Sequence, residues 1–136
     1  SAKPAPITAQ DVNHEKGFTT RSKMHVHFND DTKTITIDTP AGNSIILDEA
    51  GTRIEVKDQN QNVMTMDSAG IKLESPLEIS IKAGTNLTLE AGAQFIIKGV
   101  SVSAKASADV AVEGSASAKL SSSGITEVKG SLVKIN

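Results

Sequence analysis

The segment His25-Val26-His27 holds the two residues of this chain best suited to binding a metal. On a strand, side chains two residues apart lie on the same face. Repeated on three chains around one axis, the pair would offer six imidazoles, a set that suits an octahedral transition metal. However, Met24, Val26 and Phe28 have the opposite parity and a stronger claim on an apolar core. We therefore expect the histidines to face solvent, and we predict no metal and no cofactor.

Acidic residues gather where the chain should turn. A pair of carboxylates can support hydrolysis, but such a pair needs a cleft, which short strands joined by corners do not provide. The run 58–62, Asp-Gln-Asn-Gln-Asn, lacks the glycine and the distant glutamate of an EF-hand loop. We expect solvated corners and no catalytic residue, so we do not expect an enzyme. The acidic positions are Asp30, Asp31, Asp48, Glu49, Asp58 and Asp67.

The composition argues against an ordinary globular core. The 136 residues include no Trp, Tyr or Cys and only three Phe, and the formal net charge is −2. Large aromatic side chains usually supply much of a globular core, and disulfides are excluded. No basic patch with interleaved aromatics is present, so we expect no nucleic-acid partner. No apolar run approaches the roughly 20 residues of a membrane-spanning helix.

The elements that carry these residues are predicted from a repeat between Ile71 and Ile97. Apolar residues there come in i, i+2 pairs, and each pair begins eight residues after the last. Spacing by two indicates one face of a strand, and the repeat of eight indicates short strands joined by corners. Gly84 and Gly92 fall in these corners, where we expect a positive φ or tight packing. No helix is predicted to follow them, which argues against a phosphate-binding loop.

The alternation extends over most of the chain and divides it. Residues 1–20 have no pattern and are interpreted as a linker or neck, whereas 21–136 carry the repeat. Corners are wide in 21–70 and tight in 71–136. Fourteen inward pairs are predicted: Val26/Phe28, Ile35/Ile37, Ile45/Leu47, Ile54/Val56, Met64/Met66, Ile71/Leu73, Ile79/Ile81, Leu87/Leu89, Phe95/Ile97, Val102/Ala104, Val110/Val112, Ala118/Leu120, Thr126/Val128 and Val133/Ile135.

Strands this short cannot bury their own apolar face, so they must stack on others. A single-chain solenoid with three faces should show corners that differ with every third repeat, and no such period is present. Three identical chains wound around one axis make every repeat equivalent. We therefore predict an all-β fold, an intertwined triple-stranded β-helix that forms a homotrimeric triangular prism.

Two stretches resemble a known family. GNSIILDEAGTRIEVKDQNQNVMTMDSAGIKLESP and LEISIKAGTNLTLEAGAQFIIKG are similar to the C-terminal needle of VgrG proteins, the spikes of type VI secretion systems and relatives of contractile phage-tail spikes. The resemblance implies a homotrimeric shaft that pierces a target envelope, contacts its membrane transiently and joins upstream baseplate and tube components. It implies a bacterial cytoplasmic location before firing, then injection into a target cell, or alternatively a place in a phage or tailocin particle.

The C-terminal end is the predicted partner-binding surface. Three copies would gather apolar residues and unpaired strand edges at a tip that needs a cap, and the resemblance implies a PAAR-type tip protein there. The alternative function is a fibrous trimeric stalk of a phage tail fibre or adhesin, which would continue into another domain instead. The predicted contact residues are Leu132, Val133, Ile135 and Asn136.

Overall fold

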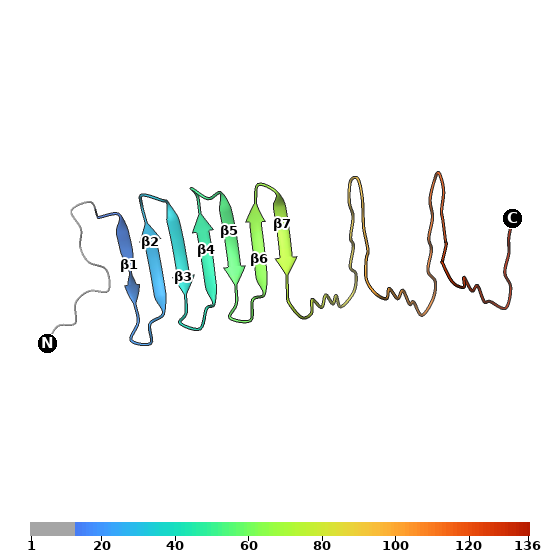
Figure 1. The fold of residues 1–136 in the computed structure, drawn as a ribbon, viewed down its shortest axis with the longest axis horizontal. Coiled ribbons are helices and arrows are strands. Elements are labelled where there is room, and N and C mark those ends of the chain that lie inside the picture. The colour runs from blue at the N-terminus through green and yellow to red at the C-terminus, as the bar shows by residue number, and fades with distance from the viewer. Residues whose placement is uncertain (1–12) are drawn as a thin grey trace. The chain divides into compact units, whose positions relative to one another are not determined.

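The computed structural model describes residues 13–136. Within this part, seven strands follow one another in a single antiparallel sheet of order β1-β2-β3-β4-β5-β6-β7 (Figure 1). The strands are β1 (Glu15–Thr19), β2 (His25–Asn29), β3 (Thr34–Asp38), β4 (Ser44–Asp48), β5 (Arg53–Lys57), β6 (Val63–Asp67) and β7 (Gly70–Glu74). The prediction of an all-β fold is confirmed, in the form of an open meander.

The apolar pairs predicted from the sequence share one face of this sheet. Cross-strand partners include Val26 with Ile37, Ile37 with Ile45, and Ile45 with Val56. The row continues through Met64 to Leu73. Because a slip of one residue would turn a strand over, this register confirms the predicted parity for all strands from β2 to β7.

Pairing in the sheet is local, which differs from our expectation that strands cross to other chains along the whole shaft. Each of β1–β7 pairs with its neighbour in sequence. The connections explain why: they run over 20–24, 30–33, 39–43, 49–52, 58–62 and 68–69, long enough for a chain to reverse on itself. Each of the first five holds one residue of positive φ, namely Lys23, Lys33, Gly42, Thr52 and Gln61, whereas after the two-residue connection 68–69 the positive φ falls on Gly70, the first residue of β7.

The three five-residue connections are built alike. In each, the first residue's N–H donates to the carbonyl of the fifth, and the fourth residue's N–H donates to the carbonyl of the first. The fourth residue is also the one with positive φ. The first residue, Thr20, Thr39 or Asp58, also bonds the fifth residue through its side-chain oxygen. These loops recur every 19 residues, a repeat of two strands and two connections.

Strand β1 lies in the segment for which the sequence predicted no element. Its register places Phe18 opposite Val26 and Lys16 opposite Phe28. Gly17 lies opposite His27, and a Cβ there would be 2.1 Å from the carbonyl oxygen of Val26. This close approach requires glycine. The sequence did not predict this strand. The interpretation of 1–20 as a linker or neck stays a prediction, and its residues 1–12 lie outside the described residues.

Beyond β7 the chain forms no strands within itself. Residues 75–136 run extended, with bends at 76–77, 84–85, 92–93, 100, 107–108, 115–116, 123–124 and 131–132. Each bend begins three residues after the second member of a predicted inward pair. Gly84 and Gly92 lie at bends as expected, but neither has a positive φ, and a Cβ at either would meet nothing within 4 Å, so within one chain neither of the two expected reasons for glycine applies. The predicted strands are absent here because no neighbouring strand is available within the chain.

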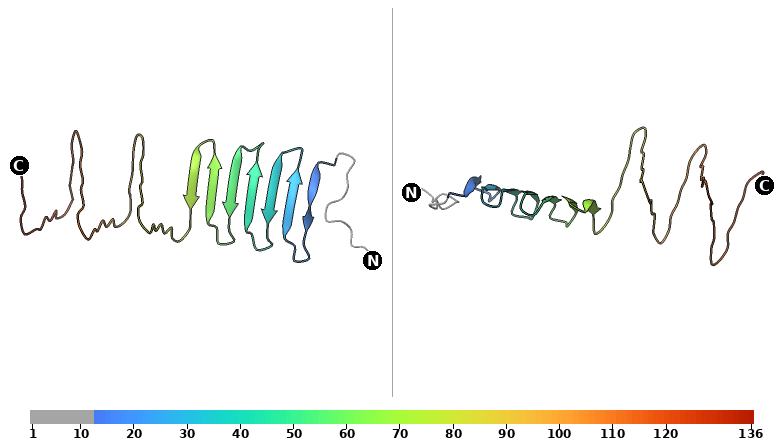
Figure 2. Two further views of the ribbon diagram at one scale, coloured as in Figure 1. Left: turned by 180° about the vertical axis from the view of Figure 1, so that it is seen from behind. Right: turned by 90° about the horizontal axis from the view of Figure 1, so that it is seen from above.

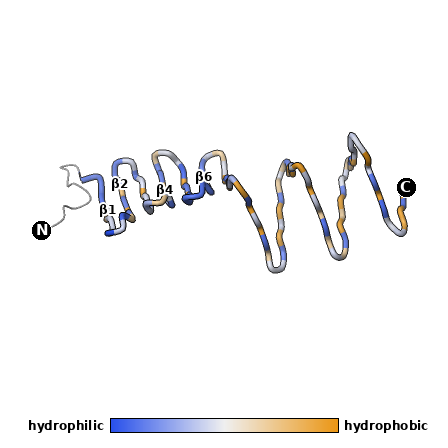
Figure 3. Tube along the Cα trace, turned by 60° about the horizontal axis from the view of Figure 1, so that its bottom comes forward, coloured by the Kyte–Doolittle hydropathy of each residue, from blue (hydrophilic) through white to orange (hydrophobic). Residues whose placement is uncertain are grey.

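Residues up to Leu87 and residues from Thr88 form two separate units. The first contains the sheet, which is a single layer seen edge-on (Figure 2). The second consists of extended segments and bends in which apolar and polar residues alternate along the trace (Figure 3). No helix of the described residues is long and apolar enough to cross a membrane.

Candidate functional site: an uncovered apolar face and an unpaired backbone

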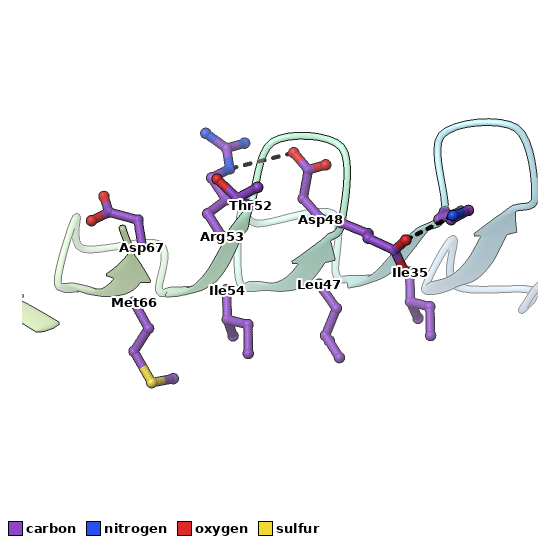
Figure 4. Close-up of a pocket in the computed structure, with 10 residues that line it drawn as sticks. Ile35, Leu47, Asp48, Thr52, Arg53, Ile54, Met66 and Asp67 are labelled. Atoms are coloured by element: carbon purple, nitrogen blue, oxygen red, sulfur yellow. Dashed lines mark hydrogen bonds and ion pairs between the residues drawn. The ribbon is translucent and has the colours of Figure 1, made fainter. Parts of the chain in front are cut away.

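The apolar face of the sheet is uncovered. Figure 4 shows Ile35, Leu47, Ile54 and Met66 on one side of the strands, and Asp48 and Arg53 on the other. No hydrophobic side chain among the described residues is buried. Ile37 is 43% exposed, Ile45 40% and Leu47 40%. A face of this size, made of large aliphatic side chains, is typical of a surface that another protein surface covers.

The polar face is the less exposed of the two in several strands. In β4, Ser44, Ile46 and Asp48 are half-buried, whereas Ile45 and Leu47 on the apolar face are exposed. The same inversion occurs in β3, where Ile37 is exposed and Thr36 is half-buried. A folded globular chain buries its aliphatic residues first. The described residues of one chain therefore form no buried core.

The second component of the site is the backbone of residues 75–136. In this segment no N–H or carbonyl group bonds to another backbone group of residues 13–136. Apart from the half-buried Ser75, every residue is exposed. Extended backbone with free donors and acceptors is a template for strand pairing. The segment therefore offers both an apolar stripe and unpaired strand edges to a partner.

The predicted tip residues lie at the end of this segment. Leu132 is 72% exposed and Ile135 is 92% exposed, while Val133 is less exposed at 46%. Asn136 is exposed as well. Leu132 lies in the bend at residues 131–132, and the other three follow that bend. These four residues are close together only because they are close in sequence, since they belong to no strand or helix.

The two candidate histidines lie on the polar face. His27 is placed opposite Gly17 and Thr36, and His25 opposite Thr19 and Asp38. Val26, between them, is paired with Ile37 on the apolar face. Among residues 13–136, no group of three or more His, Cys, Asp or Glu side chains is placed to hold a metal ion. The register thus agrees with the expectation that both histidines face away from an apolar core.

The corner carboxylates are engaged separately rather than gathered. Asp58 accepts bonds from the backbone and side-chain N–H groups of Asn62 at 2.9 and 2.8 Å, and these hold its pKa below the ordinary value. Lys33 Nζ donates to Glu49 Oε1 at 2.8 Å, and this bond raises the pKa of Lys33. Asp67 Oδ1 accepts from the N–H of Ala69 at 2.8 Å. Asp58 and Asp67 thus each close one connection between strands, and Glu49 links two connections.

Sequence reasoning missed the links between neighbouring connections. Asn43 Oδ1 accepts the N–H of Gln59 at 3.0 Å, joining two five-residue loops at one end of the sheet. Lys33 and Glu49 join two four-residue loops at the other end. The spacing of 19 residues between matching loop positions was the available signal. This repeat was hard to see in the sequence because its matching positions, Thr20, Thr39 and Asp58, are not the same residue and have in common only a side-chain oxygen.

Comparison with protein-family models and with curated proteins finds no match to this chain.

Proposed function

We propose that this chain is one third of a homotrimeric β-helical spike, the needle of a VgrG-type contractile injection machine. The single observation that carries the proposal is the combination described above: a continuous apolar face without cover, followed by a long extended backbone without partners. Copies of the same chain would supply a cover for the apolar face and hydrogen-bonding partners for the extended backbone. The resemblance to VgrG needles in the two quoted stretches supports the assignment to this class.

The trimer combines two modes of pairing. In the proposed arrangement, the β1–β7 sheet of each chain forms one wall of a triangular prism, with the three apolar faces turned toward the axis. From Ser75 on, strands pair between chains, because the chain offers them no partner of its own. The regular bends support this arrangement, since equal extended segments suit equal prism faces. This refines the uniform intertwining that we expected from the sequence.

The proposed work is mechanical. A shaft closed on all sides has no catalytic cleft, and the corner carboxylates stabilise connections, so we propose that the chain is not an enzyme. It acts by puncturing a target envelope when the machine fires, from a bacterial cytoplasm into a target cell. Transient contact with the target membrane and attachment to baseplate and tube components follow from this role.

The proposed partner at the end of the shaft is a PAAR-type cap. The exposed apolar residues Leu132, Val133 and Ile135 support a docking surface there, because three copies would present nine such side chains at one tip. Deletion of residues 132–136 is expected to abolish binding of a PAAR-type protein while the trimer persists. Failure of the intact chain to bind would favour the stalk of a tail fibre or adhesin.

Light scattering tests the assembly directly. The chain has a mass of 14.2 kDa, and we expect three times that value in solution. Hydrogen exchange provides the second measurement: amides in 75–136 should be strongly protected in the trimer, although a lone chain leaves them free. A monomeric mass, or rapid exchange throughout 75–136, would contradict the proposal.

A further inference from the structure

The strand β2 carries two imidazoles side by side on the polar face. Residues two apart on a strand are about 7 Å apart between Cα atoms, and their side chains project in the same direction. His25 and His27 have this relationship. Both are half-buried rather than fully exposed, so the neighbouring strands limit how far each ring can turn away from the other.

The cross-strand neighbours determine what surrounds the two rings. Asp38 on β3 lies opposite His25, and its Oδ1 is 2.7 Å from Nδ1 of that ring. Because a carboxylate accepts the bond, Nδ1 carries the hydrogen, and Nε2 of the neutral ring keeps its lone pair. A carboxylate bonded to the far nitrogen is the partner that orients many metal-binding histidines.

The neighbours of the second ring leave it accessible. His27 lies between Gly17 on β1 and Thr36 on β3. Gly17 has no side chain, and Thr36 contributes a hydroxyl group rather than a competing charge. Neither ring is placed to share a metal with the acidic corners, since no group of three ligands forms among the described residues. A cation held here would have two protein nitrogens and water in its other positions.

We propose that His25 and His27 chelate one divalent transition cation on the polar face of each chain, with Asp38 as the residue that positions His25. Two imidazoles suit Cu²⁺, Ni²⁺ and Zn²⁺ and not Ca²⁺ or Mg²⁺, which prefer oxygen. Cu²⁺ binds most tightly of the three. The site lies within one chain and on the polar face of the sheet, which the proposed trimer turns outward, so its stoichiometry is one metal per chain whatever the assembly state.

The experiment is calorimetric titration of the full chain with Ni²⁺ in a buffer that does not bind metals. We expect one Ni²⁺ per chain. His25→Gln and His27→Gln should each abolish measurable binding, whereas His14→Gln is the matched control and should bind as the unaltered chain does. His14 is the third histidine of the chain and lies outside the strands. Circular dichroism should show an unchanged sheet in all three variants.

Asp38→Asn tests the positioning role. We expect the affinity for Ni²⁺ to fall about 10- to 100-fold, while electron paramagnetic resonance of the Cu²⁺ form still shows two imidazole nitrogens. A purely structural role for Asp38 would leave the affinity unchanged. The proposal is overturned by one metal per three chains, which would indicate an axial site, by equal loss in His14→Gln, or by no binding.

Discussion

Ile45 and Ile46 are neighbours in β4 with identical side chains that lie on opposite faces of the sheet. Ile45 is paired with Ile37 and Val56 on the apolar face, and Ile46 with Thr36 and Glu55 on the polar face. Within one chain, Ile45 is the more exposed of the two. The structure of a single chain and the proposed trimer therefore make opposite predictions for this pair.

The first prediction follows from that pair. Ile45→Lys would place three ammonium groups near the trimer axis, where each buried, unpaired charge costs several kcal/mol. We expect the variant to lose the trimer, and light scattering should give the mass of one chain. Ile46→Lys adds a charge to the outer face and should remain trimeric. Dissociation of Ile46→Lys with an intact Ile45→Lys trimer would show that the apolar face does not form the axis.

The second prediction concerns the regular bends after β7. A single Ser inserted between Leu87 and Thr88 splits an inward pair and turns the following residues to the wrong face. We expect hydrogen exchange to show loss of protection distal to the insertion. The same Ser inserted between Thr85 and Asn86 lengthens the connection at the bend of 84–85 and leaves the pairs intact. It should retain distal protection, and equal damage from both insertions would contradict the assignment of strands and bends.

The third prediction concerns the ionisation of Asp58. Its lowered pKa arises first from the side-chain bond of Asn62, and Asn60 contributes less. A carboxyl group whose pKa is lower in the folded state stabilises the fold above its unfolded pKa of about 3.9, and this contribution is lost as the pH falls through the lowered folded value. In an NMR titration, Asn62→Ala should raise the Asp58 pKa further than Asn60→Ala does. The reverse order would disprove the assigned cause.

The fourth prediction uses the strained residue Thr52. Its φ of 51° is in the left-handed region, which is unfavourable for a β-branched side chain and tolerated by Asn. Thr52→Asn should raise the free energy of unfolding by about 0.5–1 kcal/mol, measured by denaturant titration. The control is Thr32→Asn in the connection 30–33, where the replaced residue has no positive φ. A gain of the same size in the control would mean that strain is not the cause.

The sequence predicted the face of each residue well and the pairing of each strand poorly. The alternation through Ile35/Ile37 and Ile45/Leu47 determines which side chains share a face, because the side-chain period of a strand is two. The same alternation suits a hairpin within one chain and a strand pair between chains. Only the conformation of the connections decides whether a strand pairs within its own chain or with another chain. Lys33 and Thr52 adopt the left-handed conformation in these connections, and neither residue type signals it in the sequence.

Strand β1 and the pairing of His25 with Asp38 were missed for related reasons. In β1, only Phe18 supplies an apolar residue to the pattern, and Gly17 is normally read as a break. The strand forms because its backbone pairs with β2, where the absent side chain is required. Similarly, the sequence singles out His25 and His27 but not Asp38, since Asp38 lies 13 positions after His25 and only the register of β2 and β3 brings the two together.

The order of the sheet gives it a preferred direction of load. Because β1–β7 follow one another in sequence and each pairs only with its neighbours, the hydrogen bonds run along the stack and the strands lie across it. Pulling the two ends of this sheet apart would break the strand pairs one after another. Only one pair resists at any moment, so a small force is enough. Pushing along the stack loads all strand pairs at once and compresses the hydrogen bonds between the strands without breaking them. This part of the chain should therefore resist compression along the stack better than it resists tension between its two ends.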